Sequence, residues 1–304
     1  MRYQFFNIKT ARSKFLFLIA MVIFGYILAS LTGMAIIKLL GITDVMSKIV
    51  SPDLTDVTVI QVQRIFQIAF QLGLFIFAPL LFFILVEQHS FRKLGLDCNP
   101  FTVNYLLIIA LMLIAIPGIN YTHTLNQALH LPTWLSGAEK WMFEKEQAAS
   151  KLTDAFLGLK SPSDLIWNII MFGLLPAIGE ELFFRGALFS ILREWTKRTN
   201  LTIFITAFLF SAIHLQFYGF LPRFLLGLGL GYLFYFTGSL WAPMLAHFVN
   251  NTLAVVFAYL FSTGRSSVNY SELGSVDNVA ICVTSIILTV VLFKVIERRN
   301  WSYK

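Results

Sequence analysis

The sequence predicts an all-α integral membrane protein, and both its composition and its long apolar runs support this fold class. Hydrophobic residues make up 57% of the 304 residues and charged residues only 13%, whereas soluble domains carry charge on about a quarter of their residues. The mean hydropathy of +0.74 agrees with this assignment. We therefore expect a single polytopic membrane domain over residues 1–304, with about eight transmembrane helices.

Eight apolar runs are the expected spans, because an apolar helix of about 20 residues crosses the hydrocarbon core of a bilayer. The first run carries no charge and shows no small-residue cleavage site, so we expect a retained helix and not a signal peptide. The sixth contains Gly227, Gly229 and Gly231, which let a neighbouring helix approach closely. The expected spans are residues 15–37, 65–86, 101–121, 165–195, 201–218, 220–237, 240–261 and 279–296.

The net charge of +7 indicates the orientation of the protein in the membrane. It does not indicate a nucleic-acid partner. Lys and Arg flank the apolar runs and do not form a polar basic face, which nucleic-acid binding requires. Cytoplasmic loops carry an excess of Lys and Arg, and this rule places both termini in the cytoplasm. We expect an integral, multi-pass protein of the cell membrane, and the short connectors are typical of a bacterial chain.

One polar segment, residues 137–159, repeats apolar side chains at helical spacing, with Glu and Lys between them. This pattern predicts an amphipathic helix on the membrane surface. Two alternatives are a connector helix packed on the bundle and a lid over a site.

Polar residues within the expected spans are the most informative feature. An Asp, Lys or Arg at the centre of a membrane helix costs about 3 kcal/mol on insertion, and such residues are associated with function. The candidates lie in the fourth, fifth and seventh spans. They are Glu180, Glu181, Arg185, His214, His247 and Asn251.

The fourth span contains two glutamates and an arginine directly after Pro176 and Gly179, which weaken or kink the helix. Glu181 and Arg185 are four residues apart, so they share a helix face and can pair. Glu180 points about 100° away from this pair. A structural salt bridge explains Glu181 and Arg185 but gives no reason for Glu180, whereas a site explains all three.

The polar residues of the fourth, fifth and seventh spans are expected at a similar depth in the membrane. At 1.5 Å per residue, Glu180, His214 and Asn251 lie roughly 17–21 Å from the expected cytoplasmic ends of their helices. His247 is about one turn shallower and shares a helix face with Asn251. A lone intramembrane histidine is more often structural than a ligand. Convergence at one depth, however, indicates a site.

These side chains suit the hydrolysis of an amide. Glu180 is the candidate general base that activates water, and His214 could hold that water or pass a proton to the leaving amine. His247 and Asn251 are donors of the kind that stabilise a tetrahedral oxyanion. Glu181, held by Arg185, would support the site from behind.

The motifs Glu-Glu-x-x-x-Arg at 180–185, Phe-x-x-x-His at 210–214 and His-x-x-x-Asn at 247–251 resemble those of the CPBP family. These are intramembrane CAAX prenyl proteases and bacteriocin-processing proteins, also called Abi proteins. The resemblance covers the expected core, residues 165–261. It implies an eight-helix bundle with a catalytic chamber. By the same resemblance, Glu180 and His214 activate water, while His247 and Asn251 stabilise the oxyanion.

The resemblance leaves the cofactor open between a metal-dependent and a metal-free mechanism. We expect no cofactor, because the helical His-Glu-x-x-His zinc motif is missing from the sequence. Zinc is the alternative, with Glu180, His214 and His247 as ligands. The expected partner is a membrane-embedded or lipid-anchored peptide that enters from the lipid bilayer between helices.

Two other classes of function remain as alternatives. Intramembrane Glu, His and Arg also form proton relays in transporters, although the sequence shows no inverted repeat of the kind found in many transporters. A non-catalytic immunity or scaffold protein could keep the motifs for structure.

Overall fold

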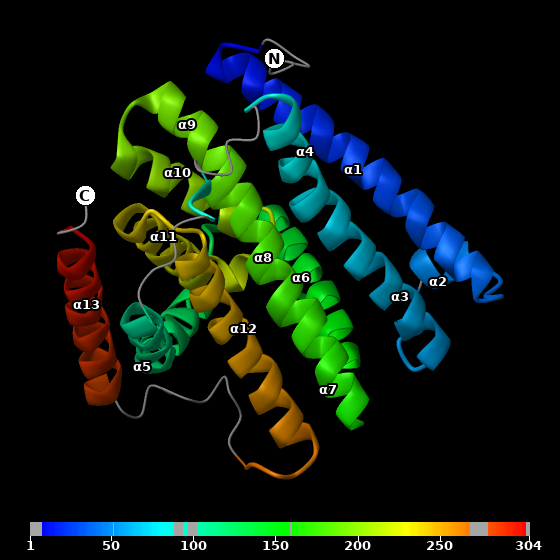
Figure 1. Cartoon of the computed structure of the whole chain (residues 1–304). Coiled ribbons are helices and arrows are strands. Elements are labelled where there is room, and N and C mark those ends of the chain that lie inside the picture. Colours follow the sequence, from blue (N-terminus) through cyan, green and yellow to red (C-terminus); the bar gives the residue numbers. More distant parts are fainter. Residues whose placement is uncertain are drawn as a thin grey trace.

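A computed structural model describes residues 8–50, 52–87, 94–96, 102–158, 160–267 and 279–301. The expected start of the third span at residue 101 and the expected end of the amphipathic segment at residue 159 lie outside these ranges. Within them the chain is all-helical and contains no β-strand (Figure 1). The helices are α1 (Ala11–Leu39), α2 (Val45–Val50), α3 (Val57–Phe70), α4 (Ala78–Leu85), α5 (Thr102–Gln127), α6 (Ser136–Leu157), α7 (Pro162–Asn168), α8 (Leu175–Glu181), α9 (Phe189–Thr196), α10 (Thr199–Ala212), α11 (Phe220–Thr237), α12 (Trp241–Ser262) and α13 (Val279–Trp301).

Two of the long membrane helices contain turns of π-helix. The turn η1 (Gln71–Phe77) joins α3 to α4, so that Val57–Leu85 is continuous. The turns η4 (Ile169–Leu174) and η5 (Leu182–Leu188) lie between α7, α8 and α9, within Pro162–Thr196. A π turn leaves the regular i to i−4 ladder and often occurs at a functional site. All three turns carry residues of the site described below.

Seven helices in the described part of the chain are long and apolar enough to cross a membrane, so the chain is a multi-pass integral membrane protein. The expected fifth span, 201–218, is shorter than predicted. Helix α10 ends at Ala212 after 14 residues, which is about 21 Å against about 30 Å of hydrocarbon. The backbone turns at Leu215, where φ is +53°. His214 therefore lies in a turn between α10 and α11.

Helices α1 and α13 lie at opposite edges of the bundle, with α8 and α12 between them (Figure 1). Helix α1 packs on α3, η1 and α4, and α13 packs on α5 and α11. The contact of α1 with η1 depends on Gly25 and Gly73, because a Cβ atom on either glycine would overlap the backbone of the other. This close crossing holds η1 in position, and with it Gln71.

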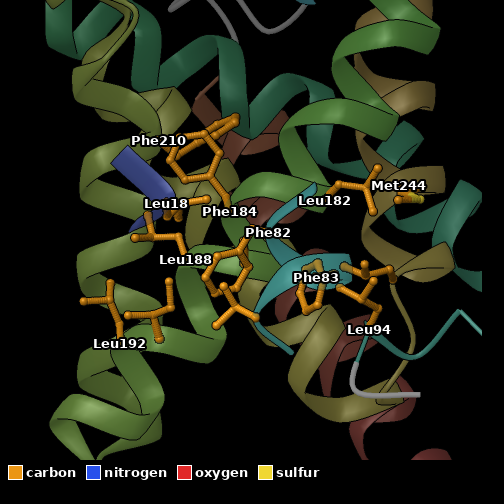
Figure 2. Packing of buried hydrophobic residues seen from close by; sticks show 14 residues of the cluster. Leu18, Phe82, Phe83, Leu94, Leu182, Phe184, Leu188, Leu192, Phe210 and Met244 are labelled. Carbon is orange, nitrogen blue, oxygen red and sulfur yellow. The ribbon is translucent and has the colours of Figure 1, made fainter. Parts of the chain in front are cut away.

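An apolar cluster supports the helix that carries the acidic motif. Figure 2 shows Phe184 and Phe210 in this cluster together with Phe82, Phe83 and Leu188. The rings of Phe184 and Phe210 meet edge to face, with their centroids 5.3 Å apart. The cluster therefore holds η5 and α10 together directly beside the buried charges.

The polar segment forms the expected amphipathic helix, α6. One face packs on the bundle: Phe156 is buried, and its carbonyl oxygen accepts a hydrogen bond from Asn168. Near its N-terminal end, Trp141 lies against Phe217, with ring centroids 5.4 Å apart. The opposite face is exposed and carries charged side chains such as Lys145. Helix α6 therefore bridges α7 and the turn before α11.

Candidate active site

A buried network joins the two acidic residues of α8 to η5 and α12. Oε1 of Glu181 lies 2.8 Å from Nη1 of Arg185 and 2.9 Å from Nδ1 of His247. All three side chains are almost fully buried. The predicted pairing of Glu181 with Arg185 is present. The contact of His247 with Glu181 is an addition that the helical spacing alone did not predict.

The Arg185 guanidinium is held from three directions. Besides Glu181, it donates through Nη2 to the carbonyl oxygen of Gly227 at 2.8 Å, and its Cζ lies 4.8 Å from the centre of the Phe210 ring. The carbonyl is close because Gly227 lets α11 approach α10: a Cβ there would lie 3.1 Å from the Cα of Ala207. The glycines expected to permit close helix contact thus help to hold the buried arginine.

Glu180 has a different environment from Glu181. It is 5% exposed, and its Oε2 lies 3.9 Å from Nε2 of His247, which is too long for a direct hydrogen bond. Its Oε1 accepts a bond from Nε2 of Gln71 at 3.4 Å. Within the described chain, no Lys or Arg lies within ion-pair distance of Glu180. One carboxylate is therefore paired with an arginine, whereas its neighbour has no such cationic partner in the described chain.

Gln71 is a site residue that the sequence analysis missed. It is the first residue of η1 and is 7% exposed. The signal available in the sequence was a pair of amides, Gln67 and Gln71, within the expected span 65–86, which is otherwise strongly apolar. Its contact with Glu180, across 109 positions of sequence, depends on tertiary packing and leaves no local pattern.

His214 and Asn251 lie at the same cavity but form no hydrogen bond to Glu180. Nδ1 of His214 lies 2.8 Å from the carbonyl oxygen of Phe210, so this nitrogen carries the proton and Nε2 remains an acceptor. Asn251 donates through Nδ2 to the carbonyl oxygen of Phe172 in η4 at 2.9 Å. An amide nitrogen has two N–H groups, so one remains for a ligand.

A cavity of about 650 Å³ connects these groups. Glu180, His214, His247 and Asn251 all line it, which agrees with the expected convergence of the three motif-bearing segments. Glu181 and Arg185 are not among the lining residues and lie behind this wall. Helix α6 forms another side through Ala149, Leu152 and Phe156, and the remaining polar lining includes Gln216 and Arg223.

The alternative metal set fits this geometry poorly. Zinc sites hold nitrogen and oxygen ligands at about 2.0–2.2 Å, and in the described chain no three His, Cys, Asp or Glu side chains converge in such an arrangement. Nδ1 of His247 is engaged by Glu181, so only Nε2 faces the cavity. We derive no catalytic step through a metal.

The fold and the site together define a class of protein: a polytopic membrane protein with a glutamate–histidine site in a cavity between its helices. Residues 162–253 match the family of type II CAAX prenyl endopeptidases, Rce1-like. This match confirms the predicted resemblance to CPBP-family intramembrane proteases over these residues, and it supports a peptidase of the hydrolase class. No curated protein and no solved structure matches the chain.

Proposed function

We propose that the protein hydrolyses a peptide bond of a lipid-anchored or membrane-embedded substrate, with water activated by Glu180. The observation that carries this proposal is the difference between the two adjacent carboxylates. Arg185 contacts Glu181 at 2.8 Å, whereas Glu180 faces the cavity beside His247 without a cationic partner in the described chain. A carboxylate placed in this way is a suitable general base.

In the proposed reaction, Glu180 accepts a proton from water while the water oxygen forms a bond to the scissile carbonyl carbon. The resulting tetrahedral intermediate carries its negative charge on the former carbonyl oxygen. The C–N bond then breaks, and the leaving amine takes a proton from Glu180, directly or through His214. One water is consumed, and the products are a carboxylic acid and an amine.

Asn251 and His247 are the proposed oxyanion donors. The second N–H of Asn251 can donate whatever the protonation state of the site. His247 already directs Nδ1–H to Glu181, so its Nε2 accepts a bond from water when the ring is neutral and donates only when the ring is protonated. The pair Glu181 and Arg185 orients His247, as carboxylates orient functional histidines in other sites.

The proposed substrate is a peptide that is anchored in the bilayer by a lipid, as the description of the matched family implies. The catalytic cavity mixes the polar groups of the site with apolar side chains such as Ile213, Leu226 and Val255. A peptide backbone with aliphatic side chains suits this lining, because apolar contacts cover the side chains while few polar groups orient the backbone.

The test is cleavage of lipid-anchored peptides by purified protein in proteoliposomes. We expect Glu180→Gln to abolish cleavage and His214→Ala to reduce it strongly, with unchanged thermal unfolding of the proteins. The matched control is Glu144→Gln, the same substitution at an exposed residue of α6. Full activity of Glu180→Gln would overturn the proposal, and proton-coupled uptake without cleavage would favour a transporter.

A further inference from the structure

Arg223 is a charged residue of the cavity that has no part in the proposed hydrolysis. It lies in the first turn of α11, is partly buried, and lines the same cavity as Glu180 and His214. A positive charge within a membrane domain is costly, and such residues are normally paired or mark a functional site. Its role therefore needs an explanation.

Among the described residues, the guanidinium of Arg223 is hydrogen-bonded by neutral oxygens only. Nη1 donates to the carbonyl oxygen of Gln216 at 3.0 Å, and Nη2 donates to the side-chain oxygen Oε1 of the same residue at 2.6 Å. No carboxylate of the described chain lies within ion-pair distance, although the charges of Glu146 and Glu180 act on it from farther away. Arg185, which is fully buried, is by contrast paired directly with Glu181.

The backbone around Arg223 leaves room for this placement. A Cβ atom on Gly219 would lie 2.6 Å from Nη2 of Arg223, so a side chain at that position would displace the guanidinium. Guanidinium groups have five N–H donors in a planar fork that matches a carboxylate. The two bonds to Gln216 fix the orientation of the fork and leave donors for an anion.

We propose that Arg223 binds the free C-terminal carboxylate of the substrate. This inference rests on the proposed peptidase function, because it places a peptide in the cavity between Glu180 and Arg223. The apolar residues Ile213 and Leu226, which also line the cavity, are suited to aliphatic side chains of the last residues. Arg223 then acts as a specificity-determining residue: the enzyme releases a short C-terminal peptide and disfavours bonds far from a chain end.

The test compares two lipid-anchored peptides that are identical except for a C-terminal carboxylate or carboxamide. For the wild type we expect kcat/KM to be roughly 10- to 100-fold higher for the carboxylate, the range of one charge-assisted contact. In Arg223→Gln this ratio should fall to about 1 while cleavage of the carboxamide is unchanged. Arg223→Lys should restore part of the preference. A purely structural arginine would lower cleavage of both peptides equally.

A binding measurement separates this inference from the proposed function. The tripeptide Val-Leu-Leu and its carboxamide are titrated by calorimetry into Glu180→Gln protein, with and without Arg223→Gln. Preference for the free acid that is lost with Arg223→Gln supports the carboxylate site, even if no peptide is ever cleaved. Equal affinity for acid and amide, or equal cleavage of both by the wild type, overturns it. Cleavage by Glu180→Gln would contradict the proposed function alone.

Discussion

Nδ1 of His247 lies 2.9 Å from Oε1 of Glu181, an oxygen that Nη1 of Arg185 contacts at 2.8 Å. One carboxylate oxygen therefore accepts from both an arginine and a histidine, and the ring of His247 is fixed with Nε2 towards Glu180. The position of the histidine in α12 is thus coupled to a salt bridge between α8 and η5.

Glu181→Gln is expected to lower kcat by roughly 10- to 100-fold, the usual effect of losing a charged partner that orients a functional histidine. The glutamine is nearly isosteric, but its neutral amide stabilises neither Arg185 nor a protonated His247. The measurement is kcat for a lipid-anchored peptide across pH. If the rate and its pH profile both match the wild type, Glu181 has no role in orienting His247.

Arg185→Met is expected to destabilise the protein by about 3–5 kcal/mol, because it leaves the carboxylate of Glu181 buried without its cation. The double variant Glu181→Leu with Arg185→Met should recover much of this loss, since both charges are then replaced by apolar groups. It should nevertheless remain poorly active. Denaturation in detergent measures the two free energies, and a double variant less stable than Arg185→Met would refute the coupling.

Gln71→Leu is expected to reduce kcat by about 3- to 10-fold, the range for loss of one neutral hydrogen bond. Its Nε2 donates to Glu180, so the variant leaves the general base less well oriented. Gln67→Leu is the matched control, because Gln67 lines the same cavity and has no hydrogen bond to Glu180. Equal rates for the two variants would show that the contact with Glu180 is unimportant.

The convergence of the motif-bearing spans could be predicted because it follows from helical geometry alone. A rise of 1.5 Å per residue predicts similar depths for Glu180, His214 and Asn251, and the structure has all three around one cavity. His214 reaches it from the turn directly after α10, two residues past the end of the helix. The pairing of Glu181 with Arg185 follows from the same periodicity. These inferences need only the spacing of residues along each helix and the cytoplasmic membrane surface as a common reference for depth.

Gln71 and Arg223 could not be assigned to the site because their importance comes from contacts between distant segments. Gln71 contacts Glu180 because η1 packs on α8, and the two residues are far apart in the sequence. Arg223 faces the cavity only because α10 stops at Ala212 and the chain turns back into α11. Each π turn contains a glycine, but a single glycine in an apolar run does not predict a π turn. The early helix end at Ala212 has no glycine or proline beside it.

Gly227→Ala is expected to destabilise the protein by about 1–3 kcal/mol, the cost of overpacking a well-packed contact. Its Cβ would lie 3.1 Å from Ala207 and 3.2 Å from the Phe210 ring, so α11 must move and its carbonyl would leave Arg185. Gly137→Ala in α6 is the control, because nothing lies within 4 Å of its added Cβ. The control should be neutral or more stable by up to about 1 kcal/mol; equal losses at both positions would contradict the packing argument.

Metal chelation is expected to leave peptidase activity unchanged, because water activation is assigned to Glu180 and not to a metal ion. The 3.9 Å between Oε2 of Glu180 and Nε2 of His247 exceeds the separation of about 3.3 Å between two ligands of one tetrahedral zinc at 2.0 Å. Protein purified with 1,10-phenanthroline is compared with protein purified with the non-chelating 1,7 isomer, and zinc content is measured in both. Stoichiometric zinc, with activity lost on chelation and restored by added zinc, would contradict the assignment. Glu180, His214 and His247 would then be the first residues to test as ligands, by measuring zinc content in variants of each.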